Sequence, residues 1–358
     1  MAYWILQGNP EIYDTYGALQ AGTIDTWRIA RHLHDISPGD EFALWISGPG
    51  GGVSALGIVT EPPKRNTDPD RFWADPADGV KPAWRVGIRI NRRLGSPIPR
   101  ADLQADPRFA KSMILRMPGG GNPFQVTPDE WLVLQSRIAA AEILALLNDD
   151  QALDELRKYF GTVAIAEPPS FTGSRFNTLA GGGARPDIRD RVTAADLIAV
   201  QCLGVTVPAS VALDLLDGHL GATISAHLRN IPCGIALGED GAHDHVEPGS
   251  PSDLAWHLLT EQHGVDWVIA GKILARKRPR LIPVYDRVVR CALRYPDSAW
   301  LWLDDLFRRN EAITDRLGLL HHVARLPELV PLLRVLDAVI WMRHREDHQD
   351  KDCPGIIR

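Results

Sequence analysis

The chain has 358 residues, of which 45% are hydrophobic and 23% are charged, and its formal net charge at pH 7 is −6. This length suffices for two domains with separate cores, and the negative charge argues against a protein that coats nucleic acid through bulk positive charge. The sequence has no run of about 18 apolar residues and no secretory signal, so we expect a cytoplasmic protein that does not enter a membrane. Its four cysteines form no CxxC pair, and we expect reduced thiols, no metal site and no cofactor.

The first 150 residues predict a compact α+β domain. Four short apolar or alternating runs, bounded by Gly, Pro and Asp, are typical of strands: residues 3–7, 41–48, 54–60 and 84–90. Residues 37–40 form a predicted turn before one strand, and residues 48–52 a flexible loop after it. Thr127 and Glu130 have the spacing of a capping box, which predicts a helix that begins there and ends near residue 148.

The remainder of the chain changes character. Residues 151–190 hold a short helix followed by a stretch rich in proline and glycine, which predicts a linker. From residue 191 to residue 358 the pattern is helical, and its last helix, 327–345, starts at a proline and ends in basic residues. The fold class is therefore predicted to be α+β, with a strand-rich domain at 1–150, a linker at 151–190 and a mainly α-helical domain at 191–358.

Positive charge is concentrated between Gly264 and Arg294, where eight basic residues stand against two acidic ones. Two helices within residues 253–276 flank a turn at Gly264, and a turn glycine lets backbone N–H groups approach a phosphate. Lys272 and Arg276 are four residues apart, on the expected polar face of the second helix. We predict that this strip binds DNA through Gly264, Val265, Asp266, Lys272, Arg276, Lys277, Arg278 and Arg287.

The spacing of Gly264, Val265, Ala270, Pro283 and Asp286 resembles the helix-hairpin-helix and Gly-Pro-Asp motif of the base-excision DNA glycosylase superfamily. The resemblance covers roughly the last 165 residues and implies a helical domain that flips a base out of the duplex and breaks its glycosidic bond. Asp286 would be the catalytic residue, which stabilises positive charge on the deoxyribose and orients or deprotonates a water. Candidates for the base pocket of this domain are Gln201, Trp267 and Tyr285.

Three departures from that family's pattern refine the expectation. Asp266 stands where the hairpin usually has its second glycine, and Val268 stands where bifunctional members carry the lysine of their Schiff base. The C-terminal four-cysteine iron–sulphur loop of the family is absent from the sequence. The resemblance therefore implies a monofunctional enzyme that leaves an abasic site. The alternative for Asp286 is a plain helix N-cap, because Asp is among the favoured capping residues.

Five segments of the first 150 residues resemble the EVE domain of the PUA-like superfamily, in that family's order: WILQGNP, TWRIARH, ISPGDEFALWISG, GVSALGIV and GNPFQVTPDEW. The resemblance implies a mixed α/β barrel-type fold that recognises modified bases in DNA, with an aromatic wall that stacks on a flipped base. The matching segments place in this pocket Trp27, Trp45 and Ser47, with Asn9 and Asn122 as further candidates. Residues expected to contact phosphate are Arg28, Arg31 and Lys64. We assign to packing Trp4, Trp84 and Trp131, and Trp45 could equally be a core tryptophan.

Together the resemblances predict a monomeric, monofunctional DNA glycosylase that excises a modified base, such as a phage-type modified cytosine, from double-stranded DNA, with antiviral defence as its setting. The alternative is a non-catalytic protein that binds modified DNA. A modification-dependent nuclease has less support because the sequence holds no PD-(D/E)xK-like or HNH cluster, and an RNA-modification reader stays open. His243 and His245 flank an aspartate but lack a third spaced ligand, which argues against zinc there.

Overall fold

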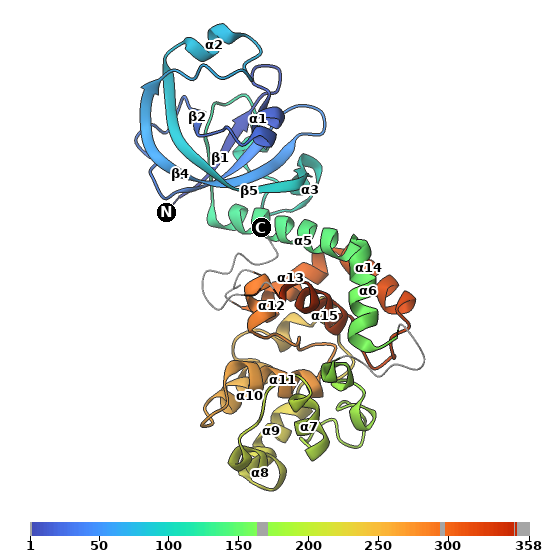
Figure 1. Cartoon of the computed structure of the whole chain (residues 1–358). Coiled ribbons are helices and arrows are strands. Elements are labelled where there is room, and N and C mark those ends of the chain that lie inside the picture. Colours follow the sequence, from blue (N-terminus) through green and yellow to red (C-terminus); the bar gives the residue numbers. More distant parts are fainter. Residues whose placement is uncertain (1, 163–170, 294–297, 347, 349–358) are drawn as a thin grey trace. The chain divides into compact units, whose positions relative to one another are not determined.

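The computed structural model describes residues 2–162, 171–293, 298–346 and 348, and it divides the chain into two compact units (Figure 1). The first unit ends at Ala141 and the second begins at Glu142. The first contains a sheet and the second contains helices, so the predicted α+β class is confirmed. None of the described helices is long and apolar enough to cross a membrane.

The first unit is built on a six-stranded sheet with the strand order β2-β5-β4-β3-β1-β6. Its strands are β1 (Tyr3–Gly8), β2 (Thr26–Arg28), β3 (Glu41–Ile46), β4 (Gly52–Asn66), β5 (Ala83–Pro99) and β6 (Phe124–Val126). β1 and β3 run parallel, and the other neighbours are antiparallel. The four predicted strands are confirmed as β1, β3, β4 and β5, and the last two are longer than predicted and curve through the unit (Figure 1).

Five helices complete this part of the chain: α1 (Thr15–Ala21), α2 (Pro76–Val80), α3 (Arg100–Ala105), α4 (Met113–Arg116) and α5 (Pro128–Asn148). The predicted start of α5 is confirmed, because Thr127 Oγ1 accepts from the Glu130 amide at 3.2 Å and the Glu130 carboxylate accepts from the Thr127 amide at 2.8 Å. α5 continues across the division between the units at residues 141 and 142.

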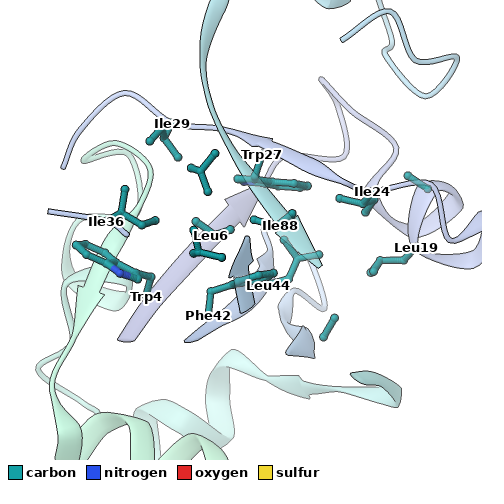
Figure 2. Close-up of a cluster of buried hydrophobic side chains, with 14 of the residues drawn as sticks. Trp4, Leu6, Leu19, Ile24, Trp27, Ile29, Ile36, Phe42, Leu44 and Ile88 are labelled. Atoms are coloured by element: carbon teal, nitrogen blue, oxygen red, sulfur yellow. The ribbon is translucent and has the colours of Figure 1, made fainter. Parts of the chain in front are cut away.

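The sheet buries side chains on both faces because successive residues of a strand point in opposite directions. In β3, Phe42 and Leu44 join one cluster, whereas Trp45 joins the other. Figure 2 shows the first cluster, in which side chains of β1, β3 and β5 lie near Trp27 of β2. The packing roles of Trp4 and Trp131 are confirmed, with exposed fractions of 0% and 3%. The same role is wrong for Trp84, which is 41% exposed.

The regular elements of the second unit are helices throughout the residues that the structure describes. Its helices are α6 (Asp150–Phe160), α7 (Ala194–Gln201), α8 (Ala209–Asp217), α9 (His219–Arg229), α10 (Pro251–Thr260), α11 (Trp267–Lys277), α12 (Arg287–Ala292), α13 (Ala299–Arg309), α14 (Glu311–Val323) and α15 (Leu332–His344). Short 3-10 helices occur at Thr172–Arg175, Leu179–Gly181 and His243–His245.

The structure differs from the predicted linker at 151–190. α6 packs against α15 and buries Leu156 and Phe160, four residues apart on one face. Further along, Phe176 is fully buried. The described parts of 151–190 therefore belong to the second unit, and their proline and glycine content serves turns within it.

Two helices, α10 and α11, form the predicted hairpin. The turn between them has Gly264 at a φ of +80°, a conformation that favours glycine. α11 differs from the prediction because it has no polar face: residues 268–277 are buried throughout, including its basic residues.

Candidate functional site

A cavity of about 400 Å³ lies in the first unit. Its walls come from the end of β1, the strand β2, the segment that follows β2, and β5. Residues that line it include Gln7, Gly8, Asn9, Tyr13, Thr26, Trp27, Arg28, Asp68, Trp73, Arg85 and Asn122. This volume is in the lower part of the range of small-molecule pockets, so the cavity suits a ligand as small as a single base.

Three aromatic rings form one wall of this cavity. Tyr13 packs edge-on against Trp27, with ring centroids 6.1 Å apart, and it lies tilted against Trp73 at 5.0 Å. The Tyr13 hydroxyl donates to Asp70 Oδ2 at 2.9 Å. Burial, followed by this hydrogen bond, raises the pKa of Tyr13, so the phenol stays neutral. The wall thus offers apolar ring surface to a ligand.

Arg85 is the charged group of the cavity. Its side chain is 3% exposed, and Nη1 bonds to Asp68 Oδ2 at 2.7 Å. Burial lowers the pKa of Arg85 and raises the pKa of Asp68, so desolvation outweighs the attraction between them. Nε and Nη2 of Arg85 are buried without a hydrogen-bond partner among the residues that the structure describes. Buried donors of this kind are rare, and an acceptor on a ligand would satisfy them.

Asn122 links two walls of the cavity through hydrogen bonds. Its Nδ2 donates to the carbonyls of Gln7 and Arg28, each at 3.0 Å, and its Oδ1 accepts from the Gln7 amide at 3.0 Å. Because these bonds use both ends of the amide, Asn122 fixes β1 to β2. Asn9 is exposed, and its Oδ1 accepts from the Glu11 amide at 3.0 Å.

A second cavity, of about 210 Å³, lies in the second unit beside Asp286. Tyr159 and Phe171 stack in its wall with ring centroids 5.3 Å apart, and Trp341 lies edge-on to both. Arg334 forms an ion pair with Asp337, and its guanidinium lies 5.0 Å from the Tyr159 ring centroid. The cavity therefore combines a carboxylate at its edge with aromatic surface and a buried ion pair.

Asp286 is the N-cap of α12. Its Oδ1 accepts from the Val289 amide at 3.0 Å, so the capping role is confirmed. Asp286 is partly exposed and also lines the cavity. The capping bond uses one carboxylate oxygen, and Oδ2 has no hydrogen-bond partner within the described ranges. Asp286 can therefore cap α12 with one carboxylate oxygen and offer the other to the cavity.

Two protein families match the chain. The DUF6308 family, a family of unknown function, matches residues 152–344, more than half of the sequence. The chain belongs to the DUF6308 family. The EVE domain matches residues 2–137, which confirms the predicted EVE domain. The likeness of the DUF6308 region to DNA glycosylases stays a prediction.

Solved structures similar to this DUF6308 protein are aligned over about a third of its length. A hypothetical protein from Leishmania major has 15% identity over 37% of this chain and 92% of that chain, with a TM-score of 0.31. Atu2648 from Agrobacterium tumefaciens has 21% identity over 37% and 90%, with a TM-score of 0.28. Human THYN1, solved in complex with DNA containing 5-methylcytosine, has 15% identity over 37% and 95%, with a TM-score of 0.30. No curated protein matches the chain.

Of the residues predicted to line the pocket of the EVE domain, Trp27, Asn9 and Asn122 do so, together with the predicted phosphate contact Arg28. Trp45 does not, because it faces the opposite cluster and is 4% exposed. Ser47 does not line the cavity either, but its hydroxyl donates to the carbonyl of the lining residue Gly8 at 2.8 Å.

Two further residues predicted to bind phosphate lie on the surface of the EVE domain. Arg31 is exposed, and Lys64 is exposed and pairs with Glu61 at 3.0 Å.

The lining residues of the EVE cavity that sequence reasoning missed include Tyr13, Asp68, Trp73 and Arg85. A signal existed in residues 68–73, where two aspartates precede two aromatic residues after a strand. A second signal was Arg85, a charged residue directly before the apolar positions of a strand run.

In the DUF6308 region four cations of the predicted basic strip are internal. Lys272, Arg276, Lys277 and Arg278 are each no more than 2% exposed. The prediction that these four bind phosphate is wrong, because buried groups on distant segments hold their charges. Arg276 and Lys277 bond to Asp196 at 3.0 and 2.9 Å.

The other two buried cations, Arg278 and Lys272, have partners of their own. Arg278 pairs with Asp190 at 2.6 Å, and Lys272 donates to the Leu203 carbonyl at 3.0 Å. Burial lowers the pKa of Lys272, and the nearby charge of Asp286 opposes that shift.

At the hairpin, Gly264 is exposed and Val265 is buried. Asp266 caps α11 through the amides of Val268 and Ile269, and it pairs at 3.3 Å with the exposed Arg287. A carboxylate in this place weakens the predicted phosphate site, because it repels an anion. Arg294 lies outside the described residues.

The predicted base-pocket residues of the DUF6308 region do not line the cavity at Asp286. Gln201 is exposed at the end of α7. Trp267 and Tyr285 contact each other with ring centroids 5.8 Å apart, and Arg290 lies over Trp267 at 5.2 Å. His243, which is exposed, pairs with the buried Asp304 at 3.5 Å and with the exposed Glu247 at 3.9 Å.

Proposed function

We propose that this protein binds DNA and holds a flipped, modified base in the cavity of its EVE domain. The observation that carries the proposal is Arg85, a buried guanidinium with two N–H groups that no described residue accepts. A ligand with acceptors would satisfy these donors and remove the cost of burying them, about 1–3 kcal/mol for each unsatisfied group.

The chemistry of the cavity suits a modified cytosine. The Watson–Crick edge of cytosine carries two acceptors, O2 and N3, which complement the paired donors Nε and Nη2 of Arg85. A substituent at carbon 5 leaves that edge unchanged and needs apolar space, which the wall of Tyr13, Trp27 and Trp73 supplies. Stacking of a base on such rings contributes about 1–3 kcal/mol. The exposed Arg28 at the cavity mouth supports contact with phosphate.

Binding to matched DNA duplexes tests this proposal. Fluorescence anisotropy with unmodified, 5-methylcytosine and 5-hydroxymethylcytosine duplexes should show preference for one modified duplex. Arg85→Met, which keeps the length but removes the donors, should abolish the preference and weaken binding roughly tenfold or more. Arg89→Ala, an exposed arginine of the same strand, is the control and should keep the preference. A folded Arg85→Met protein with undiminished preference refutes the proposal.

A second candidate function, excision of a base, has support from the cavity at Asp286. We propose that the DUF6308 region is a monofunctional glycosylase in which Asp286 stabilises charge on the deoxyribose and water completes the reaction. The support is the coincidence of a partly exposed carboxylate with stacked Tyr159 and Phe171 in one cavity. Val268, where a Schiff-base lysine would stand, is buried and apolar, which fits a reaction without strand cleavage.

Alkali treatment distinguishes excision from simple binding. A glycosylase leaves abasic sites, so modified duplexes should break only after heating in alkali. Asp286→Asn keeps the cap because Asn caps helices about as well as Asp, and it should lower excision by roughly 10²–10⁴-fold without unfolding the protein. If modified DNA is bound but is not broken after heating in alkali, excision is excluded and only the binding function remains. Full excision by Asp286→Asn would exclude the catalytic role of this residue.

A further inference from the structure

A third cluster of reactive side chains lies in the second unit, apart from both cavities. It consists of Cys291 in α12, His344 at the last position of α15, and His348 just beyond. Cys291 is 1% exposed, His344 is 4% exposed and His348 is partly exposed. The Cys291 Sγ and one ring nitrogen of each histidine all lie within 4.8 Å of one another.

We propose that Cys291, His344 and His348 bind a zinc ion. Zinc takes cysteine sulphur at about 2.3 Å and histidine nitrogen at about 2.0–2.1 Å in tetrahedral geometry. The nitrogen and sulphur ligand atoms around one such ion are therefore about 3.3–3.6 Å apart. Because the three atoms already lie within 4.8 Å, small side-chain rotations bring them to that spacing. The spacing of four residues between the histidines is also usual for a zinc ligand pair.

The ligand types select the metal. One thiolate and two imidazoles favour zinc, whereas magnesium and calcium prefer oxygen ligands. Burial of Cys291 and His344 suits a bound ion, because a metal-bound thiolate loses its proton and a metal-bound imidazole stays neutral. Three protein ligands leave one tetrahedral position, which a water can fill on the partly exposed side of His348.

The site would connect two helices that build the cavity at Asp286. Asp286 caps α12, and Cys291 follows five residues later in the same helix. α15 carries Arg334 and Asp337 of the cavity wall and ends at His344. Neither Cys291 nor His344 lines that cavity, so the ion would not touch a bound base. We therefore assign the metal a positioning role, and this inference does not depend on base excision.

Metal analysis of the full chain, purified without a polyhistidine tag from zinc-supplemented culture, tests the proposal. We expect about one zinc per chain. Replacement by Co²⁺ should give the visible absorption of a tetrahedral ion and a thiolate-to-metal charge-transfer band. Cys291→Ser and His348→Ala should each lose most of the zinc and, for Cys291→Ser, the charge-transfer band. Cys233→Ser and His257→Ala, both away from the cluster, are the matched controls and should keep both signals.

Stability provides a readout that is independent of activity. A chelator should lower the melting temperature of the wild-type protein, and added zinc should restore it, whereas neither should affect His348→Ala. Because His348 is partly exposed, this variant should keep its far-ultraviolet circular dichroism even if Cys291→Ser does not fold. A folded wild-type protein that takes up no zinc on reconstitution refutes the site. Full zinc content in folded His348→Ala or folded Cys291→Ser also refutes it, and the cluster is then only a hydrogen-bonded group.

Discussion

The buried carboxylate of Asp196 should be among the most stabilising side chains of the second unit. It binds Arg276 Nε at 3.0 Å and Lys277 Nζ at 2.9 Å, and the three side chains are 2%, 1% and 0% exposed. It also forms a capping box with Thr193 at the start of α7. Asp196→Ala would therefore leave two cations in a low-dielectric interior and remove the acceptor of the Thr193 amide, which is one half of the capping box.

The expected loss follows from these two effects. Removing one partner of a buried ion pair costs about 3–5 kcal/mol, and loss of the hydrogen bond from the Thr193 amide costs about 1 kcal/mol. Asp196→Ala should therefore lower the free energy of unfolding by about 4–6 kcal/mol. For a unit of this size each kcal/mol lowers the melting temperature by about 2–4 °C, so we expect a fall of about 10–20 °C. Asp196→Asn keeps an acceptor for the Thr193 amide and should lose less.

Scanning calorimetry and urea denaturation of the full chain measure this effect. Asp187→Ala is the control, because Asp187 is 64% exposed and pairs with the exposed Arg185 at 3.3 Å. That surface pair should contribute less than about 1 kcal/mol. If Asp196→Ala changes the free energy of unfolding by as little as the control does, the buried network does not stabilise the unit as described.

Two further predictions concern pH and the cavity of the EVE domain. Burial lowers the pKa of Lys272 in the folded state below its ordinary value of 10.5. Between the folded-state pKa and the unfolded-state pKa, the unfolded state therefore binds more protons than the folded state. In that range the contribution of Lys272 to stability rises with pH, and it is lost as pH falls. Urea denaturation at pH 8 and pH 10 should show wild type gaining on Lys272→Met by up to about 1.4 kcal/mol per pH unit, and a constant difference would contradict the lowered pKa. A Cβ at Gly8 would meet Thr15 Oγ1 at 2.5 Å and Trp27 at 3.3 Å, so Gly8→Ala should displace Trp27 and weaken binding of modified DNA in anisotropy measurements. Unchanged affinity would argue against a base beside Trp27.

The regular elements follow well from sequence pattern. Strands β1, β3, β4 and β5 were predictable because alternating apolar residues and flanking turn residues are local signals. The capping boxes at Thr127 and Thr193 are local as well. β2 and β6 have three residues each, too few to show a period of two. The last helix begins at Leu332 and not at Pro327, because Pro331 is a second proline that suits a helix start.

The buried basic residues were not predictable from local sequence. Lys272 and Arg276 have the spacing of a polar helix face, which normally means solvent. Their partners, the Leu203 carbonyl and Asp196, lie 69 and 80 residues away in the chain. Only the tertiary fold brings these groups together, so a basic strip in sequence became an internal network in the structure.

The candidate sites show the same limit. Asp286 was predictable as a helix N-cap, and the structure adds its place in a cavity whose walls come from α6, residues 171–173 and α15. Trp27 was found through the resemblance to EVE domains. Tyr13 and Arg85 were missed, because they line one cavity only through the tertiary fold, which also brings Asp68 and Trp73 to it.

The Asp68–Arg85 pair implies a conflict between selection for recognition and selection for stability. A domain kept only for its folding would gain from an uncharged pair, since replacing a buried ion pair by neutral groups of similar volume is often stabilising by about 1–4 kcal/mol. The double variant Asp68→Asn, Arg85→Met should then melt at a higher temperature while it discriminates less among bases. Under the proposed function, the buried guanidinium of Arg85 lowers the stability of the domain in exchange for selectivity among bases.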